Sequence, residues 1–438
     1  MHLRENIIFR GAQSVNSDGE VYGEGEKHGA RRCPAFAAAA ISPPCDNPRI
    51  CGEMRTATVP IFGSFILHMK QRRQWRYPGM LACALLMAGM VFLMSPESRA
   101  TLRRPQTPGQ PLPYAVEQVT FGNAGSRIRL SGTLNLPRGP GPHPAIVLVP
   151  GSGPVDRDGS VLGHQFYLVL ADHLTRQGFA VLRSDKRGLG KSGGDFATAT
   201  TFDFARDIEA ALAFLRSRSG IDARRIGLVG HSEGGLVGAI VAGRDPAVSF
   251  LVLMAGNGVP MTEIIAERLA RLAKGGPAGA ARERALQQAV FAAAQAPGSE
   301  HARAAALRKL FLGAQAEYGR AFSEEEYAMY LTPWMRTLLS IDPQALLRQV
   351  RCPVLALVGG KDVVVTADLN VPALERALAA KPRAEVQLMP ALNHFFQTAR
   401  RGDIEEVASI EETLAPDVLG LIGDWSRRQA GRPAEPER

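Results

Sequence analysis

Short apolar runs recur along the middle and the end of this chain, and polar or amphipathic segments separate each run from the next. Runs of four or five residues without polar interruptions are typical of strands buried on both faces, as in a parallel sheet covered by helices. The intervening amphipathic segments supply the crossover helices that parallel strands require. The pattern predicts an α/β fold with a mostly parallel, doubly wound sheet. Its predicted strands lie at 145–149, 179–182, 226–229, 250–253, 354–358 and 386–389, with crossover helices at 165–176 and 202–217.

Two further patterns flank and interrupt this rhythm. Strand-like segments at 115–121 and 128–136 predict an antiparallel pair that leads into the sheet. Roughly between residues 260 and 350 the rhythm stops, and apolar residues recur at helical spacing instead. The sequence therefore predicts a linker at 101–114, a core of residues 115–259 and 351–428, a disordered tail at 429–438, and a helical cap at 260–350 inserted between the strands near 249–255 and 353–358.

The first 100 residues do not share this organisation. Residues 1–68 show neither strand nor helix periodicity, so we expect a disordered leader or an upstream extension that precedes a native start at Met69. A basic segment, an apolar run at 80–94 and small residues at 98–100 then follow one another, which is the plan of an export signal. The run of about fifteen residues is shorter than the ~20 of a spanning helix. We therefore expect a signal peptide at 69–100 and a periplasmic or secreted protein; the alternative is a membrane anchor formed by residues 80–94.

Charge and cysteine content narrow the choice of partners. The net charge of +9 is not gathered into a Lys/Arg run with interleaved aromatic residues, so we expect no nucleic-acid partner. Four of the five cysteines precede residue 101, which leaves Cys352 without a disulfide partner in the mature segment. No spacing of cysteine and histidine typical of a metal site occurs, and we expect neither a metal nor a cofactor. Beyond the export signal we expect no stable membrane association, and the sequence leaves the oligomeric state open.

One serine lies in a sequence context that favours a nucleophile. Residues 230–234 read GHSEG, directly after an apolar run and directly before a helical pattern, which is where a G-x-S-x-G motif has chemical meaning. The two glycines permit a sharp turn that presents the Ser232 hydroxyl above the sheet, and a base must take its proton during attack. The alternative is an ordinary glycine turn with a helix-capping serine.

Two later strand ends offer the partners that such a serine needs. Asp362 follows the run at 354–358, and His394 follows the run at 386–389. Because the carboxyl ends of parallel strands meet at one edge of the sheet, we expect these side chains to approach Ser232. The order Ser232, Asp362, His394 is the order found with this type of sheet. Asp368 is an alternative acid. His394 is the only histidine after His301, and its alternative role is that of a loop residue hydrogen-bonded to the backbone.

Backbone donors and apolar side chains complete the predicted site. The N–H groups of Glu233 and of Ser152, in the glycine-rich loop after the first parallel strand, are the expected donors to an oxyanion. The Glu233 carboxylate then remains available to pair with a cap or loop cation, and Asp185 and Arg187 can brace the neighbouring loop. Phe395, Phe396 and Trp334 are the expected substrate-binding side chains. The alternative for the cap aromatics is that they form the cap's own core.

Together these motifs resemble the α/β-hydrolase superfamily, in particular exported bacterial esterases similar to serine-aminopeptidase-like and dienelactone-hydrolase-like enzymes. The resemblance covers about residues 115–428 and rests on 150–153, 184–192, 230–235, 352–362 and 392–397. Where many relatives carry a histidine in the oxyanion loop, this chain has Pro150.

The resemblance implies an α/β-hydrolase fold and a serine hydrolase that cleaves carboxylic esters through an acyl-enzyme, and the apolar side chains expected at the site favour a small or medium acyl group. In that mechanism Ser232 is the nucleophile, His394 the base and Asp362 the residue that orients the base. The alternatives are a serine aminopeptidase, a thioesterase or acyltransferase on the same fold, and a binding protein that has lost catalysis.

Overall fold

The computed structural model describes residues 103–431. The predicted leader at 1–68, the signal peptide at 69–100 with its alternative anchor at 80–94, and residues 432–438 of the predicted tail lie outside the described residues. Within the described part of the chain, no helix has the length and apolar character needed to cross a bilayer.

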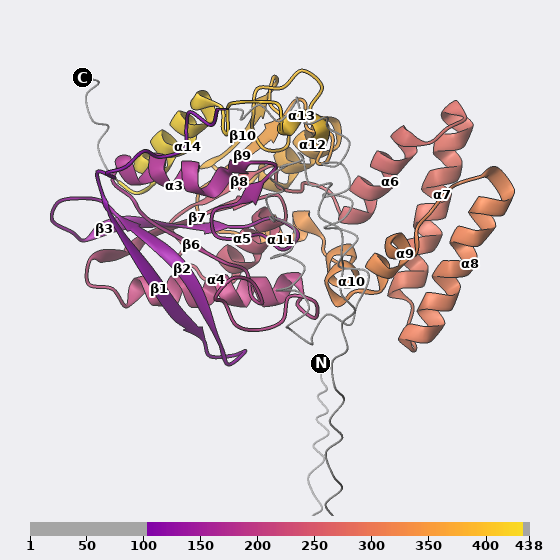
Figure 1. Ribbon diagram of the computed structural model, residues 1–438, viewed down its shortest axis with the longest axis horizontal. Coiled ribbons are helices and arrows are strands. Elements are labelled where there is room, and N and C mark those ends of the chain that lie inside the picture. The colour runs from indigo at the N-terminus through magenta and orange to yellow at the C-terminus, as the bar shows by residue number, and fades with distance from the viewer. Residues whose placement is uncertain (1–102, 432–438) are drawn as a thin grey trace, which may run out of the picture. The chain divides into compact units, whose positions relative to one another are not determined.

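An eight-stranded sheet forms the centre of the described structure, as the apolar runs predict (Figure 1). Its spatial order is β1-β2-β6-β3-β7-β8-β9-β10, in which β1 and β2 are antiparallel to each other and β2 is antiparallel to β6. The remaining neighbours pair in parallel. The strands are β1 (Ala115–Asn123), β2 (Ile128–Leu136), β3 (His143–Val149), β6 (Ala180–Ser184), β7 (Ile221–His231), β8 (Leu251–Met254), β9 (Val354–Gly359) and β10 (Ala384–Met389).

Helices cover both faces of this sheet, so the mostly parallel, doubly wound arrangement is confirmed. One face packs against α3 (Phe166–Arg176) and α14 (Pro416–Gln429), and the other packs against α4 (Thr201–Arg216), α5 (Glu233–Arg244) and α12 (Ala367–Leu378). Alternate residues of β3 serve the two layers: Ile146 and Leu148 face α3 and α14, whereas Val147 and Val149 face α4 and α5. Every residue of β3, β8 and β9 is buried, which explains why their sequences are continuous apolar runs.

The segment between β8 and β9 is helical throughout, in agreement with the loss of strand rhythm there. It contains α6 (Met261–Leu272), α7 (Gly276–Gln295), α8 (Glu300–Tyr318), α9 (Glu324–Leu331), α10 (Pro333–Leu339) and α11 (Pro343–Gln349). The first five form a separate apolar cluster that includes Phe291, Phe311 and Tyr330. Figure 1 shows α6, α7 and α8 standing away from the sheet. The last helix, α11, packs instead on α5 and α12 of the core.

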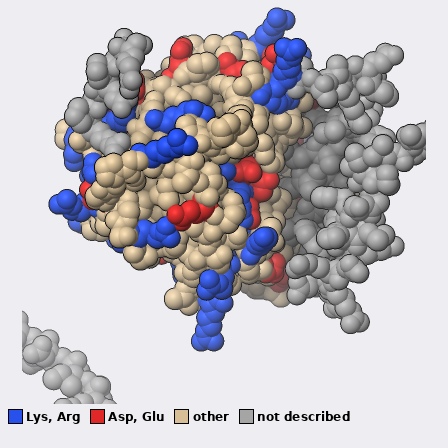
Figure 2. All heavy atoms as spheres, turned by 60° about the vertical axis from the view of Figure 1, so that its left-hand side comes forward, with Lys and Arg blue, Asp and Glu red and all other residues tan. Residues whose placement is uncertain are grey.

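Three short elements of the described chain lie outside the main sheet and its covering helices. A hairpin of β4 (Ser160–Val161) and β5 (His164–Gln165) precedes α3, and the short α13 (Ile404–Val407) precedes α14. On the face drawn in Figure 2, Lys and Arg side chains are scattered over neutral surface and interspersed with Asp and Glu, so this face carries no continuous basic band.

Candidate active site

Ser232 occupies a sharp turn between β7 and α5. Its backbone angles of φ 55° and ψ −122° lie in a region that residues with a side chain rarely adopt. The flanking glycines make this turn possible, because a Cβ on Gly230 would lie 2.2 Å from the Gly234 carbonyl oxygen, and a Cβ on Gly234 would lie 2.1 Å from the Val149 carbonyl oxygen. We call this strand-to-helix turn the elbow; its backbone conformation is the one expected of a G-x-S-x-G motif in this position.

Asp362 and His394, predicted from two separate strand ends, lie side by side. The Nδ1 atom of His394 is 2.8 Å from Oδ2 of Asp362, and both residues are buried. The other carboxylate oxygen, Oδ1, accepts hydrogen bonds from the N–H groups of Val364 (2.7 Å) and Val365 (2.8 Å). An imidazole that donates its Nδ1–H to a carboxylate has Nε2 as its proton-accepting nitrogen.

The alternative acid, Asp368, lies elsewhere. Its side chain is more than half exposed and pairs with Arg271 of the cap helix α6. Asp368 therefore belongs to a surface ion pair. The aspartate that contacts His394 is Asp362.

His231 joins the histidine loop to the elbow. Its Nε2 atom is 2.8 Å from the carbonyl oxygen of His394, and the two imidazole rings are 4.9 Å apart. Burial, together with the neighbouring His394 ring, lowers the pKa of His231 to about 3, so the ring is neutral near pH 7 and donates its Nε2–H to that carbonyl. Because His231 directly precedes Ser232, this bond holds the loop of His394 against the turn that carries the serine.

The glycine-rich loop after β3 packs against the same turn. A Cβ on Gly151 would lie 3.3 Å from Cβ of Ser232 and 3.0 Å from the His231 carbonyl oxygen, so glycine lets the loop approach the turn more closely than a residue with a side chain would. The N–H of Gly151 donates to the Tyr167 hydroxyl at 3.1 Å. Among residues 103–431, neither the N–H of Ser152 nor that of Glu233 has an acceptor. The two predicted oxyanion donors are thus unoccupied N–H groups beside the elbow.

The Glu233 side chain is almost completely buried, at 1% exposure, and links three parts of the structure. Its Oε1 atom accepts hydrogen bonds from Thr201 Oγ1 of α4 and from Trp334 Nε1 of the cap helix α10, each at 2.8 Å. Its Oε2 atom lies 3.6 Å from the ammonium of Lys186, which is the loop cation with which this carboxylate pairs. The residue after the serine therefore connects the elbow to the core and to the cap.

The three predicted substrate-binding residues have different positions. Trp334 reaches from the cap to Glu233 and is partly buried. Phe395 is partly buried beside the predicted base, with its ring 5.5 Å from the His394 ring and 5.6 Å from the His231 ring. The expectation for Phe396 is wrong: its side chain is 0% exposed and belongs to the core layer under α3 and α14. Phe395 packs against the edge of the same cluster, but its ring also contacts the rings of His231 and His394, so Phe395 remains the candidate substrate contact of the two.

Several residues that contact the site were not predicted from the sequence. Tyr167, Thr201 and Lys186 all contact the elbow or the oxyanion loop, yet none belongs to a recognisable catalytic motif. Asp185 and Arg187 were expected to brace the loop beside the active site, and each is held by its own ion pair. Asp185 pairs with Arg157 at 2.5 Å, and Arg187 pairs with Asp207 at 2.7 Å.

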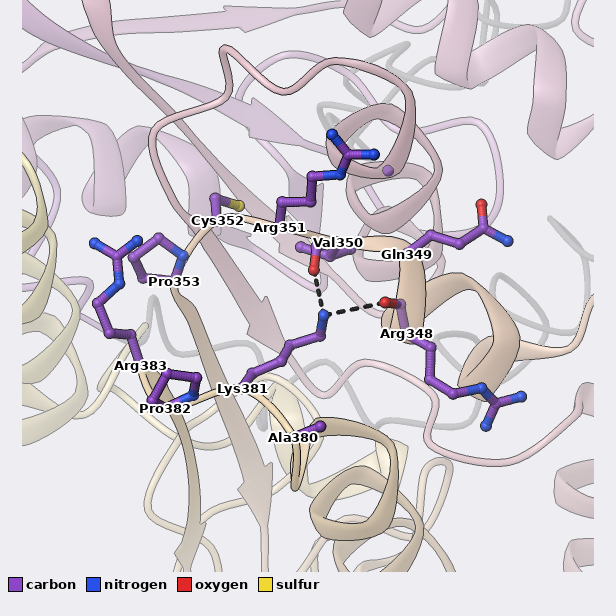
Figure 3. A pocket seen from close by; sticks show the side chains of 11 residues that line it. Arg348, Gln349, Val350, Arg351, Cys352, Pro353, Ala380, Lys381, Pro382 and Arg383 are labelled. Carbon is purple, nitrogen blue, oxygen red and sulfur yellow. Dashed lines mark hydrogen bonds between the residues drawn. The ribbon is translucent and has the colours of Figure 1, made fainter.

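A cavity of about 620 Å³ lies at the opposite edge of the sheet, where β9 and β10 begin (Figure 3). Cationic side chains line it, but the ammonium of Lys381 is already bonded to the carbonyl oxygens of Arg348, at 3.1 Å, and of Val350. The guanidinium groups of Arg348, Arg351 and Arg383 point in different directions (Figure 3). Because α11 and α12 both end here, these cations complement the negative ends of two helices. This cavity is separate from the site around Ser232.

Within the part of the chain that the structure describes, no group of three or more histidine, cysteine, aspartate or glutamate side chains is arranged to hold a metal ion.

Comparison with known proteins points in the same direction as the geometry. Residues 146–407 match the alpha/beta hydrolase family. The esterase EstD of Thermotoga maritima is 26% identical over 286 residues, which are 65% of this chain and 62% of that protein. The chain thus spans less than two thirds of the length of this curated relative.

Solved structures to which the chain is similar include an esterase of Pyrococcus furiosus, with a TM-score of 0.47 and 16% identity over 76% of this chain and 99% of that chain. A hypothetical protein of Pseudomonas aeruginosa has a TM-score of 0.46 and 18% identity over 76% of this chain and 98% of that chain.

Proposed function

The chain belongs to the alpha/beta hydrolase family, and from that premise we propose that it hydrolyses carboxylic esters of small molecules through an acyl-enzyme on Ser232. The observation that carries the proposal is the hydrogen bond of 2.8 Å between Asp362 and His394, on a loop that His231 fastens to the strained turn of Ser232. A serine, a base and a residue that orients the base are the components that nucleophilic acyl transfer needs.

In the proposed reaction, the Ser232 hydroxyl attacks the ester carbonyl carbon while His394 Nε2 takes its proton. Asp362 accepts the Nδ1–H of His394 and stabilises the imidazolium that forms. The negative oxygen of the tetrahedral intermediate is held by the N–H groups of Glu233 and Ser152, and each such donor typically lowers the barrier by about 3 kcal/mol. His394 then protonates the departing alcohol, and the same residue activates the water that hydrolyses the acyl-serine.

Three carboxylates of the cap are held in ion pairs, and this supports an ester substrate over a peptide with a free N-terminal ammonium group. An aminopeptidase needs a carboxylate that is available to the substrate's ammonium group. In the described part of the cap, Glu283 and Glu326 both pair with the half-buried Arg320, and Glu267 pairs with Arg284. These carboxylates are therefore already neutralised, whereas Trp334 and Phe395 offer apolar surface that suits an acyl group.

The proposal is tested with p-nitrophenyl esters of increasing acyl length, assayed beside aminoacyl p-nitroanilides and an acyl thioester. We expect the wild-type protein to hydrolyse the esters and Ser232→Ala to lose that activity while keeping its melting temperature. Cleavage of the anilides alone would contradict the ester proposal and favour an aminopeptidase, and preferential cleavage of the thioester would favour a thioesterase.

We also propose that residues 69–100 direct export of the protein, on the strength of the basic, apolar and small-residue pattern in that segment. Mass spectrometry of the N-terminus of natively expressed protein tests this. We expect a mature chain that begins close to residue 101, and a chain that begins near Met1 would refute both the start at Met69 and the cleaved signal.

A further inference from the structure

Lys186 is a buried cation beside the elbow, and the mechanism above gives it no part. It follows β6 in the loop that leads to Ser192, and only 6% of its surface is exposed. Lysine is seldom buried to this degree unless its ammonium group has partners. Burial lowers the pKa of Lys186, and the neighbouring Glu233 carboxylate opposes that shift.

Three oxygen atoms and two aromatic rings, those of Phe204 and Phe196, surround this ammonium group. Its Nζ atom donates to the carbonyl oxygens of Gly151 at 2.7 Å and Gly153 at 3.3 Å, and it lies 3.6 Å from Oε2 of Glu233. It also lies 4.0 Å from the centre of the Phe204 ring. The two carbonyl oxygens accept hydrogen bonds from the ammonium group, and the Glu233 carboxylate, at 3.6 Å, balances its charge as an ion pair.

Both carbonyls belong to the loop that offers the oxyanion donor. The Gly151 carbonyl and the Ser152 N–H are parts of one peptide group, which is trans and planar. In such a group the C=O and the N–H point in opposite directions, so a cation that fixes the carbonyl also fixes the direction of the N–H. The second bond, to the Gly153 carbonyl, fixes the peptide group between Gly153 and Pro154.

We propose that Lys186 is a positioning residue that aims the Ser152 N–H at the oxyanion by holding the Gly151 and Gly153 carbonyls from behind. The ion pair with Glu233 joins this loop to the second donor, since the other oxyanion N–H is that of Glu233 itself. Through Trp334 Nε1 the same carboxylate also contacts the cap, so a chain of polar contacts runs from the cap to both donors. The effect of Lys186 on catalysis rests on the proposed ester hydrolysis. Its contact with the loop carbonyls does not depend on that proposal.

Lys186→Met is the variant that tests this, and Lys381→Met is its matched control. Lys381 likewise donates to two backbone carbonyls, but it does so at the opposite edge of the sheet (Figure 3). Two readouts are needed: kcat and KM with a p-nitrophenyl ester, and backbone hydrogen exchange at Gly151 and Val155. The N–H groups of those two residues are bonded to Tyr167 Oη and to the Gly153 carbonyl, so exchange there reports on the loop.

We expect Lys186→Met to lower kcat by about 100-fold with KM changed by less than about threefold, because a misplaced oxyanion donor acts on the transition state. Exchange at Gly151 and Val155 becomes at least about tenfold faster in the same variant. Lys381→Met leaves both readouts at the wild-type level. Wild-type kcat together with wild-type exchange in Lys186→Met overturns the inference, and faster exchange with wild-type kcat overturns its catalytic part.

A double variant tests whether Lys186→Met acts only by leaving the buried Glu233 carboxylate without its counter-charge. Lys186→Met with Glu233→Gln removes both members of the buried ion pair, and the glutamine amide oxygen still accepts from Thr201 and Trp334. We expect kcat to stay about 100-fold below wild type, because the two carbonyls still lack their donor. Recovery to within about threefold of wild type would show that Lys186 serves only to neutralise Glu233. If the wild-type protein hydrolyses no ester while exchange still accelerates in Lys186→Met, the proposed function fails and the holding of the loop stands.

Discussion

Substitution of Gly234 by alanine is a sharp test of the elbow because the expected clash involves backbone atoms. A Cβ at this position would lie 2.1 Å from the Val149 carbonyl oxygen and 2.9 Å from the Pro150 carbonyl oxygen. An ordinary contact needs about 3.4 Å or more, so the turn of Ser232 and the end of β3 must separate by about 1 Å. A displacement of that size in a catalytic group typically lowers the rate by about 100-fold.

The stability change follows from two opposing effects. Alanine in a helix is favoured over glycine by up to about 1 kcal/mol, whereas overpacking of a close contact costs about 1–3 kcal/mol. We therefore expect Gly234→Ala to lower the free energy of unfolding by about 1–2 kcal/mol and kcat by about 100-fold.

Gly420→Ala provides the matched control. Gly420 lies within α14, and a Cβ added there meets no atom within 4 Å. This variant should gain about 0.5–1 kcal/mol of stability and keep its wild-type kcat. The assays are chemical denaturation and steady-state ester hydrolysis. If Gly234→Ala matches Gly420→Ala in both, then the tight turn is not a requirement of the site and the reasoning fails.

Three further substitutions are tested by ester hydrolysis or by thermal unfolding. Asp362→Asn should lower kcat by about 10⁴-fold at neutral pH, since the amide no longer selects the Nδ1–H tautomer of His394; a loss below tenfold would exclude that role. Trp334→Phe should lower the free energy of unfolding by about 1–3 kcal/mol because Glu233 Oε1 loses one buried donor, and an unchanged melting temperature would argue against the bond to the cap. Burial lowers the pKa of His164 to about 4, from an ordinary value of 6.5. The neutral buried ring therefore contributes stability above about pH 6.5 that is lost as the pH falls toward 4, at up to about 1.4 kcal/mol per pH unit. His164→Gln should flatten the dependence of the melting temperature on pH in this window, and a dependence as steep as that of wild type would contradict the assignment.

The parallel core was predictable because burial on both faces leaves a continuous apolar run in the sequence. The run at 354–358 became β9, Val354–Gly359, with only one residue added at its end. The run at 226–229 became the longer β7, because Asp222, Arg224 and Arg225 lie in a strand end that is not fully buried and so shows no apolar pattern. The hairpin of β4 and β5 could not be predicted, since two-residue strands are too short to show any period.

The pairing of Asp362 with His394 was also accessible from sequence, because both residues follow parallel strands whose carboxyl ends meet at one edge of the sheet. The position of Phe396 was not. Phe395 and Phe396 are identical side chains at neighbouring positions of the motif. Only the loop conformation, with Phe396 at φ 60°, decides which ring enters the core.

Lys186 shows a different limit of sequence reasoning. A lysine between Asp185 and Arg187 has the pattern of a solvated loop, and lysine side chains are usually exposed. Its burial depends on Glu233 and on two carbonyls of the 150–154 loop, which are distant in sequence and meet only in the folded sheet. Such a partnership leaves no local pattern to detect.

The most direct test of the central claim is covalent labelling with a fluorophosphonate, followed by peptide mass spectrometry. We expect one adduct per wild-type chain, on the peptide that contains Ser232, and no adduct on Ser232→Ala. A wild-type protein that remains unlabelled, or a Ser232→Ala variant that is labelled equally well, would contradict the assignment of Ser232 as the nucleophile.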